Sequence, residues 1–269
     1  MRMSLIAAAA VLTFAPLAAT AQRGQQQEER NAFTYSGELA AGTRITVRNV
    51  NGAIRVESTT GRNVEISATK RWRRSDPNLV TIEATRVNNG RDVLVCVKWS
   101  PETNCTETSY NTPRGRDGGT RNNDTSVEIV VRLPAGAHVV ANTVNGALEI
   151  RGATGEVRAN TVNGGIDAES SGGPVSANTV NGSVRVRMGA LPEQGASYKT
   201  VNGSITISIP SGANAVVEAR TVNGSISSDF PVTVQGTMSP RRLTGTIGTG
   251  GPRLEFSTVN GSIRLQKNN

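Results

Sequence analysis

The sequence predicts an all-β protein in which a single-chain β-solenoid of 16–21-residue Val-Asn-Gly repeats follows a less regular N-terminal β region. The main observation is the repeat, because a period near 20 residues is typical of solenoids and other arrays. From the second copy onward the tripeptides are 18, 18, 21, 21 and 37 residues apart. We expect the longest interval to contain a degenerate copy at Thr244-Gly245, where Thr replaces Asn. The seven asparagines are Asn51, Asn145, Asn163, Asn181, Asn202, Asn223 and Asn260.

The second observation is that apolar residues alternate with polar ones on both sides of each Asn. The third residue after Asn is aliphatic in every copy and the fifth in most, with Ser228 as the exception. Residues four and six before Asn are mostly apolar as well. This period of two predicts two short strands per repeat, each with one buried face. Asn and Gly join them as structural turn residues, since both tolerate positive φ.

Two architectures fit such a repeat. An antiparallel meander is the alternative, because Asn-Gly between alternating strands is also a strong hairpin signal. The solenoid is favoured because every copy keeps the same residue type at the same phase, as stacking of rung on rung requires. Asn and Thr side chains would then form ladders along one corner.

Four regions follow one another along the chain. Residues 1–21 have the charge, apolar run and small-residue site of a signal peptide cleaved near Ala21. Residues 22–36 are expected to be a disordered leader, residues 37–133 the N-terminal β region, and residues 134–269 the repeat array. Residues 101–125 form a polar insertion, expected to be a mobile surface loop. Strands of the N-terminal region are expected at 44–50, 53–57, 63–69, 79–86, 92–99 and 126–133.

The signal peptide predicts a secreted, periplasmic or cell-envelope location. A retained membrane anchor is the alternative, although the apolar run is short for a span. No Cys follows the cleavage site, which argues against a lipid anchor. In an oxidising compartment, Cys96 and Cys105 are expected to form a disulfide at the base of the polar insertion.

Several segments together resemble a known family. They are the opening Ser36-Gly37-Glu38-Leu39, the unit from Val50 to Val56, the Arg132-Leu133-Pro134-Ala135-Gly136 segment before the array, and the recurring Thr-Val-Asn-Gly-Ser-Ile. Over nearly the whole mature chain the sequence is similar to the DUF4097 family. That resemblance implies a β-solenoid of bacterial envelopes with a proposed role as an adhesin. No catalytic residues are defined for the family, so none is transferred.

The sequence predicts no catalytic, cofactor-binding or metal site. The lone histidine, His138, has no Ser, Cys or Asp motif around it that suggests a triad. Asp117 and Asp124 flank a glycine-rich loop, but they lack the dense Asp spacing of calcium loops. Asn-Gly-Ser at Asn181, Asn202, Asn223 and Asn260 matches a glycosylation acceptor pattern, yet the turn explains both residues without a sugar.

Two pairs of carboxylates are candidate catalytic residues. Asp167 and Glu169 alternate on one expected strand, and Glu102 and Glu107 lie near the expected disulfide. Glycoside hydrolysis needs two carboxyl groups opposed across a groove. A polysaccharide-active lyase or hydrolase on a β-helix scaffold is therefore the alternative function.

Charge is the more informative signal, because the chain has a formal net charge of +8. The densest cluster is Lys70-Arg71-Trp72-Arg73-Arg74, and Arg241-Arg242 is a second group. A basic surface attracts polyanions, which for an envelope protein are anionic glycans or lipids rather than nucleic acid. The alternative is that cations simply prevent exposed strands from pairing with other chains. Further outward or connector cations are expected at Arg151, Arg158, Arg185, Arg187, Arg220 and Arg264.

These features favour a non-enzymatic, adhesin-like or scaffolding protein that presents a rigid basic surface. The cluster Lys70, Arg71, Trp72, Arg73 and Arg74 is its candidate polyanion-binding site. No cofactor is expected, and the sequence predicts no particular oligomeric state.

Overall fold

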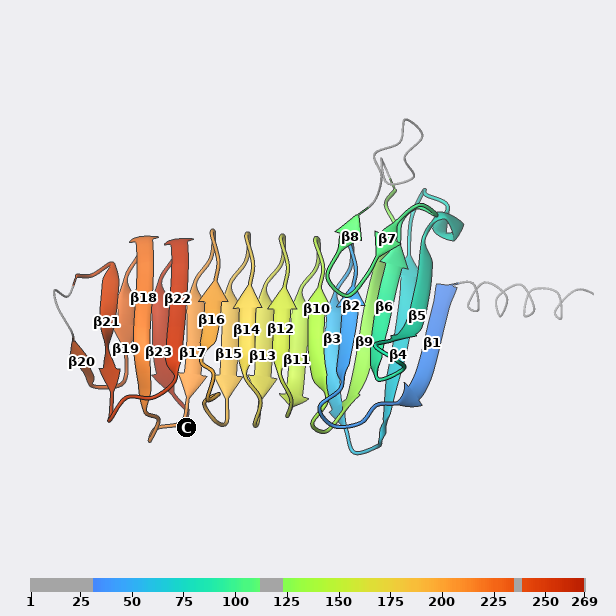
Figure 1. The fold of residues 1–269 in the computed structure, drawn as a ribbon. Coiled ribbons are helices and arrows are strands. Elements are labelled where there is room, and N and C mark those ends of the chain that lie inside the picture. Colours follow the sequence, from blue (N-terminus) through green and yellow to red (C-terminus); the bar gives the residue numbers. More distant parts are fainter. Residues whose placement is uncertain (1–30, 112–122, 235–238, 269) are drawn as a thin grey trace, which may run out of the picture.

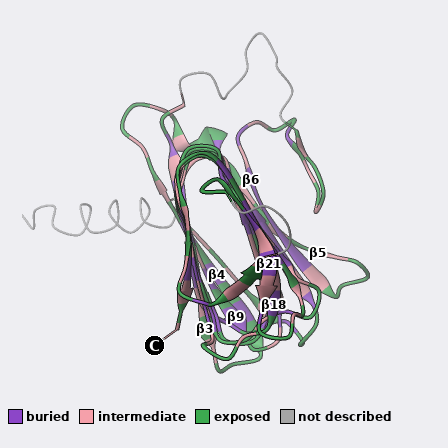
Figure 2. Ribbon diagram, turned by 90° about the vertical axis from the view of Figure 1, so that its left-hand side faces the viewer, coloured by how far each residue is buried: buried purple, intermediate pink, exposed green. Residues whose placement is uncertain are grey.

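The computed structural model describes residues 31–111, 123–234 and 239–268. It is an elongated stack of strands in two facing sheets, and only one short 3-10 helix, η1 (Pro77–Leu79), occurs in these ranges (Figure 1). Viewed along the stack, the two sheets form the walls of a flattened loop with the buried residues between them (Figure 2). The signal peptide predicted at residues 1–21 and the first part of the predicted leader lie outside the described residues.

Each sheet is a single row of hydrogen-bonded strands. The first sheet runs in the order β1 (Ala32–Glu38), β4 (Asn63–Arg71), β9 (Ser126–Pro134), β3 (Ile54–Thr59), β11 (Leu148–Ala153), β13 (Ile166–Ser170), β15 (Val184–Met188), β17 (Ile205–Ile209), β23 (Ile263–Lys267), β19 (Ile226–Ser228). The second runs in the order β20 (Val232–Val234), β21 (Arg242–Ile247), β18 (Ala215–Asn223), β22 (Arg253–Asn260), β16 (Ala196–Lys199), β14 (Val175–Asn178), β12 (Val157–Asn160), β10 (His138–Asn142), β2 (Arg44–Arg48), β6 (Asp92–Lys98), β5 (Thr81–Val87).

The solenoid prediction is confirmed, because equivalent strands of successive repeats pair in parallel and in register. Val139 of β10 lies beside Val157 of β12, which lies beside Val175 of β14. In the other sheet, Ile166 lies beside Val184 in the same way. A rung is therefore one strand of the second sheet, a Val-Asn-Gly corner and one strand of the first sheet. The hairpin meander is excluded.

The core consists of columns of side chains that repeat from rung to rung. The aliphatic residues that alternate around each Asn are buried, as the sequence pattern predicts. Towards the C-terminal end a column of alanines gives way to Tyr198 and Phe256, whose rings stack with centroids 5.4 Å apart. The Tyr198 hydroxyl lies 3.2 Å from the Met188 sulfur, and complete burial raises the pKa of this phenol. Larger side chains thus fill the core where the repeat lengthens to 21 residues.

The corners from Asn145 onward are joined to one another by the same two kinds of side-chain hydrogen bond. Along the stack the asparagines follow the order Asn145, Asn163, Asn181, Asn202, Asn260, Asn223, and from Asn163 onward each Nδ2 donates to the Oδ1 of the Asn before it at 2.8 Å. The Thr two residues before Asn is buried, and its hydroxyl donates to a glycine carbonyl of the neighbouring corner. For Thr200 and the Gly182 carbonyl the distance is 2.8 Å. These ladders tie the corners together along the edge of the stack.

The corner glycine is required by close approach rather than by backbone conformation. A Cβ on Gly164 would lie 2.0 Å from the Gly146 carbonyl oxygen, and the same holds for Gly182 above Gly164. Positive φ is not the general reason, since five of the seven corner glycines have negative φ. Asn88 and Asn89 are the only non-glycine residues with positive φ in the described ranges, so the corner asparagines do not use it either.

The interval of 37 residues has a different origin from the one predicted. Thr244 lies inside β21, which pairs antiparallel with β18. The prediction of a degenerate corner at Thr244-Gly245 is therefore wrong. The last two strands, β22 and β23, instead lie between the rung β16/β17 and the rung β18/β19. Asn260 accordingly bridges Asn202 and Asn223 in the ladder.

The N-terminal end has an analogous arrangement. β6 and β9 form a rung that lies outside the first rung, β2/β3, and antiparallel strands β5, β4 and β1 complete the end. Residues 32–36 belong to β1, paired with β4, so that part of the leader is wrongly predicted as disordered. Residues 101–111 of the polar insertion contain a small hairpin, β7 (Asn104–Cys105) and β8 (Tyr110–Asn111), and residues 112–122 lie outside the described part.

Two adjacent glycines give a test of the close-approach constraint. We expect Gly164→Ala to lower the free energy of unfolding by about 1–3 kcal/mol, the usual cost of overpacking. Gly165→Ala is the matched control, because its Cβ would meet nothing nearer than the Ser183 carbonyl at 3.4 Å. Urea denaturation measures both, and equal destabilisation by the two substitutions would contradict the explanation.

The asparagine ladder gives a second test. Asn181→Ala removes one hydrogen bond to Asn163 and one from Asn202, both 2.8 Å long. Because the side chain is exposed, we expect a loss of about 1 kcal/mol, seen as a fall in Tm of about 2–4 °C. Ser183→Ala, at the same corner, is the control: it loses only a long contact of 3.4 Å from the Ser204 N–H and should leave Tm nearly unchanged. An unchanged Tm for Asn181→Ala would show that the ladder contributes no stability.

Candidate functional site

The predicted basic cluster lies at the N-terminal end of the stack, where β4 ends and the chain turns towards η1 (Figure 1). Arg71, Trp72, Arg73 and Arg74 line a shallow hollow of about 620 Å³ together with Asp124 and Ser126. The three arginines are exposed and the indole is half-buried. Arg71 forms an ion pair of 3.0 Å with Glu128 on β9. No ion pair involves Arg73 or Arg74 among the described residues, so their charges face solvent.

Asp124 holds the backbone of this turn in place. Its carboxylate accepts hydrogen bonds from the backbone N–H groups of Arg74 and Ser75, each at 3.0 Å, and a longer one from Arg73. The Ser75 hydroxyl accepts a return bond of 2.7 Å from the Asp124 N–H. The hydrogen bonds from the Ser75 side chain and backbone, with those from Arg74 and Arg73, lower the pKa of Asp124 to about 2. The carboxylate is therefore ionised wherever the turn is intact.

Lys70 has a different role from the rest of the predicted cluster. Its ammonium group donates to the Pro77 carbonyl oxygen at 3.2 Å, within the segment that carries η1. Partial burial lowers the pKa of this lysine, against the raising effect of Asp76. The structure thus brings together four of the five predicted residues and assigns the fifth to the support of the turn.

The outer face of the first sheet carries columns of charge. Arg151 lies between Glu149, at 3.3 Å, and Asp167, at 2.8 Å, and Glu149 also pairs with Arg55 at 3.1 Å. The hydrogen bond from Arg151 is the main cause that lowers the pKa of Asp167. Further along the stack the balance changes, since Arg185, Arg187 and Arg264 are exposed and make no ion pair with described residues. The N-terminal half of this face is neutralised and the C-terminal half is basic.

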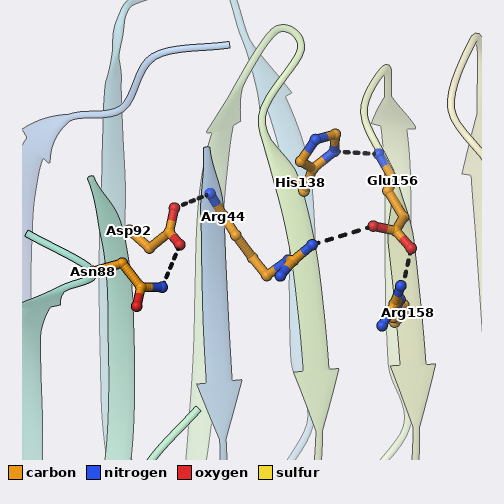
Figure 3. Close-up of polar contacts among 6 residues, drawn as sticks. All are labelled: Arg44, Asn88, Asp92, His138, Glu156 and Arg158. Carbon is orange, nitrogen blue, oxygen red and sulfur yellow. Dashed lines mark hydrogen bonds and ion pairs between the residues drawn. The ribbon is translucent and has the colours of Figure 1, made fainter. Parts of the chain in front are cut away.

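His138 belongs to a polar network on the second sheet (Figure 3). Its Nδ1 accepts a hydrogen bond of 2.8 Å from the Glu156 backbone N–H. The Glu156 carboxylate contacts Arg158 at 2.6 Å and Arg44 at 3.4 Å. The Arg44 backbone N–H in turn donates to Asp92 at 2.8 Å. The network links β6, β2, β10 and β12 across the sheet, so these side chains hold neighbouring strands together.

The carboxylates considered for catalysis are not opposed across a groove. Asp167 and Glu169 point outward from the same face of β13, and Asp167 is paired with Arg151. Glu107 accepts hydrogen bonds from the Asn88 amide at 3.0 and 3.1 Å. No group of three or more His, Cys, Asp or Glu side chains that could hold a metal ion occurs in the described ranges. Asp117, considered for calcium, lies outside them.

The two cysteines are joined by a disulfide with a Cα–Cα distance of 6.3 Å. It connects β6 to β7 and so fastens the small hairpin to the second sheet. The Tyr110 hydroxyl adds a hydrogen bond of 2.6 Å to the Val97 carbonyl oxygen. This hairpin lies at the corner edge of the outermost rung, in the place that a Val-Asn-Gly corner occupies in the other rungs.

The structure defines a two-sheet parallel β-solenoid with antiparallel strands at both ends and a basic hollow beside one of them. The family model for Toastrack DUF4097 matches residues 45–266, and the chain belongs to this family. No curated protein matches the chain. No helix in the described part of the chain is long and apolar enough to cross a membrane.

Two solved structures illustrate how distant the structural relatives are. A proposed cell adhesion protein from Clostridium sporogenes is 9% identical with a TM-score of 0.48, over 88% of this chain and 100% of its own. A proposed adhesin from Bacteroides fragilis is 11% identical with a TM-score of 0.37, over 88% and 97%. The family match, rather than these likenesses, is what identifies the chain.

Sequence reasoning did not find Asp124 as a partner of the cluster. Asp124 lies 50 residues from Arg74, at the end of the polar insertion, and no local pattern connects the two. The one usable signal is that β9, which begins at Ser126, two residues after Asp124, has the same alternation as β4. Antiparallel pairing of those two strands places Ser126 opposite Arg71 and so brings Asp124 beside the turn.

The low pKa of Asp124 predicts how the turn responds to acid. A carboxyl whose pKa is lower in the folded state than in the unfolded state stabilises the fold at pH values above its unfolded-state pKa. That contribution is lost as the pH falls through the folded-state pKa. We therefore expect the amide chemical shifts of Arg74 and Ser75 to be constant at pH 4 and above and to move only as pH approaches about 2. Asp124→Asn should lack this transition. A midpoint near 4 in the unsubstituted protein would contradict the assignment.

Proposed function

We propose that this protein is a secreted or cell-envelope, non-enzymatic, adhesin-like scaffold that binds anionic glycans or lipids. The observation that carries the proposal is the hollow of Arg71, Trp72, Arg73 and Arg74, referred to below as the basic turn. Its backbone is fixed by Asp124 while two of its guanidinium groups have no ion-pair partner among the described residues.

The chemistry of the basic turn suits a ligand with anionic groups on an otherwise uncharged body. Guanidinium groups bind carboxylate, phosphate or sulfate through paired hydrogen bonds. The half-buried indole of Trp72 offers an apolar surface beside them. Because the turn is already ordered, less conformational entropy is lost on binding than with a flexible basic segment.

The charge of the whole molecule supports the same ligand class. The net charge of +8 and the exposed arginines on the C-terminal half of the first sheet attract polyanions over the range of the Debye length, about 8–10 Å. The alternating ion pairs around Arg151 would contribute little to such attraction, since they are neutralised locally.

Location and the absence of catalysis are parts of the same proposal. The disulfide is typical of an oxidising compartment, which supports the secreted or envelope location expected from residues 1–21. Asp167 of β13 is paired with Arg151 on an open face, an arrangement that supports a binding surface rather than a hydrolytic one.

Charge reversal at two matched places tests the site. We expect Arg73→Glu with Arg74→Glu to weaken binding to dextran sulfate, and to vesicles of anionic phospholipid, about tenfold or more, because charge-assisted contacts are lost. Arg241→Glu with Arg242→Glu is the control, since this exposed pair lies near the other end of the stack and changes the net charge equally. Affinity is measured at several salt concentrations, with neutral dextran as a second control.

Three outcomes would overturn parts of this proposal. Equal weakening by both double variants would show that diffuse charge, not the basic turn, is responsible. No binding by the unsubstituted protein at low salt would refute the polyanion ligand. Cleavage of any tested polysaccharide would refute the non-enzymatic assignment.

A further inference from the structure

The position of the last rung is not the one that chain order would give. β22 and β23, residues 253–267, form an arch that lies between the rung β16/β17 and the rung β18/β19. Thr206 of β17 lies beside Arg264 of β23, which lies beside Ser227 of β19. A later segment is thus inserted between two rungs that are consecutive in the sequence. We call residues 253–267 the C-terminal arch and the space that it occupies the slot.

Both walls of the slot carry the same motif in the same phase. Thr-Val-Asn-Gly occurs at 200–203 and 221–224, 21 residues apart, which is also the step from Asn181 to Asn202. The arch has the same tetrapeptide at 258–261, and it makes the usual ladder bonds on both sides. Asn260 bonds the asparagines of both walls, Thr258 donates to the Gly203 carbonyl, and the Gly261 carbonyl accepts from Thr221. The slot therefore accepts any rung with this corner, and a second copy of the chain supplies an identical one.

The core also allows the slot to be emptied and refilled. Tyr198 of β16 lies opposite Ala177 on one side and Phe256 of the arch on the other. The next residue in this column is Ala219 of β18. Without the arch, Tyr198 would face Ala219 as it already faces Ala177. In this column the two walls can thus meet with side chains of suitable size.

A short glycine-rich linker joins the arch to the preceding structure. β21 and β22 lie on opposite sides of β18, and residues 248–252 cross the beginning of that strand. Gly248 and Gly250 have φ of 60° and 84°. The linker is held by Asn214, whose Oδ1 accepts a hydrogen bond from the Thr249 backbone N–H at 2.9 Å. Five residues can extend to about 17 Å, more than the two strand spacings of about 4.8 Å each that they cross here.

We propose that the C-terminal arch is an exchangeable rung through which one copy of this chain binds another, with the arch of one molecule occupying the slot of its partner. Reciprocal exchange preserves every contact that the arch makes within one molecule, including the ion pair of Arg253 with Glu218 and the contact of Lys267 with the Phe230 ring. Exchange of an identical element is for this reason a low-cost route to association.

Interchain disulfides between matched positions test the exchange. One chain carries Thr206→Cys and a second, size-tagged chain carries Arg264→Cys; these positions are register partners on adjacent strands, about 4.8 Å apart. The mixture is incubated in a glutathione redox buffer a few degrees below Tm. We expect a disulfide-linked heterodimer joining the two substituted positions, in a yield at least fivefold above the control mixture. That control combines Thr206→Cys with Arg185→Cys, which are register partners on β17 and β15, outside the arch.

A single chain with both Thr206→Cys and Arg264→Cys shows whether the geometry permits the bond, and it should form the disulfide within one molecule. Once oxidised, this chain has its arch locked and should form no exchanged dimer. Formation of the internal disulfide without any heterodimer in the mixture would overturn the proposal. Equal heterodimer yields in the test and control mixtures would overturn it as well, since they would reflect random collision.

Discussion

The whole stack depends on the close approach of successive corners. The carbonyl oxygen of one corner glycine lies where a Cβ of the next would be, so the rungs meet at a distance that only glycine permits. At that distance the Asn amides fall within hydrogen-bond range of one another, and the buried Thr hydroxyls reach the glycine carbonyls. The corner thus fixes the parallel register from which every column of the structure follows. A one-residue slip would move the core residues to the outer face.

Fixed register also determines what the outside can do. Residues at one phase form a column, so an arginine on one rung and a carboxylate on the next are brought together without any other guidance, as with Arg55 and Glu149. Apart from a register shift between Ile150 and Ala153 in β11, the longer irregular segments among the described residues lie where rungs turn or where the stack ends. The largest excursion, from Trp99 to Thr125, replaces a corner, and the Thr125 carbonyl still accepts a hydrogen bond of 2.7 Å from Asn51. The ladder is therefore continued by backbone where the motif is missing.

Much of the fold could be predicted because the repeat itself indicates the strands and their stacking. The alternation around each Asn predicts the strands, and the constant phase predicts parallel stacking. The spatial order of the rungs could not be predicted, since the corners at Asn223 and Asn260 have the same Thr-Val-Asn-Gly-Ser-Ile sequence and either could follow Asn202. The sequence shows the basic cluster as a run of cationic residues, but it does not show how these residues are arranged. Asp124, 50 residues from Arg74, holds the backbone of the turn, and Lys70 donates to the Pro77 carbonyl instead of lining the hollow. Local patterns describe rungs well and contacts between distant segments poorly.

The two ends of the stack consequently differ in kind from its middle. A central rung is held on both sides by rungs with the same corner motif. The sequence can change the type of its outward side chains, but each of them keeps its place in a column. At the N-terminal end the chain leaves the register, and the antiparallel pairing of β4 with β9 brings Asp124 to a basic turn that no repeat could build. At the C-terminal end the register is kept but its order is altered, so that two rungs of equal corner sequence enclose a third. The candidate binding site lies where the repeat is broken, and the proposed exchange of rungs involves the part of the stack where the corner sequences are identical.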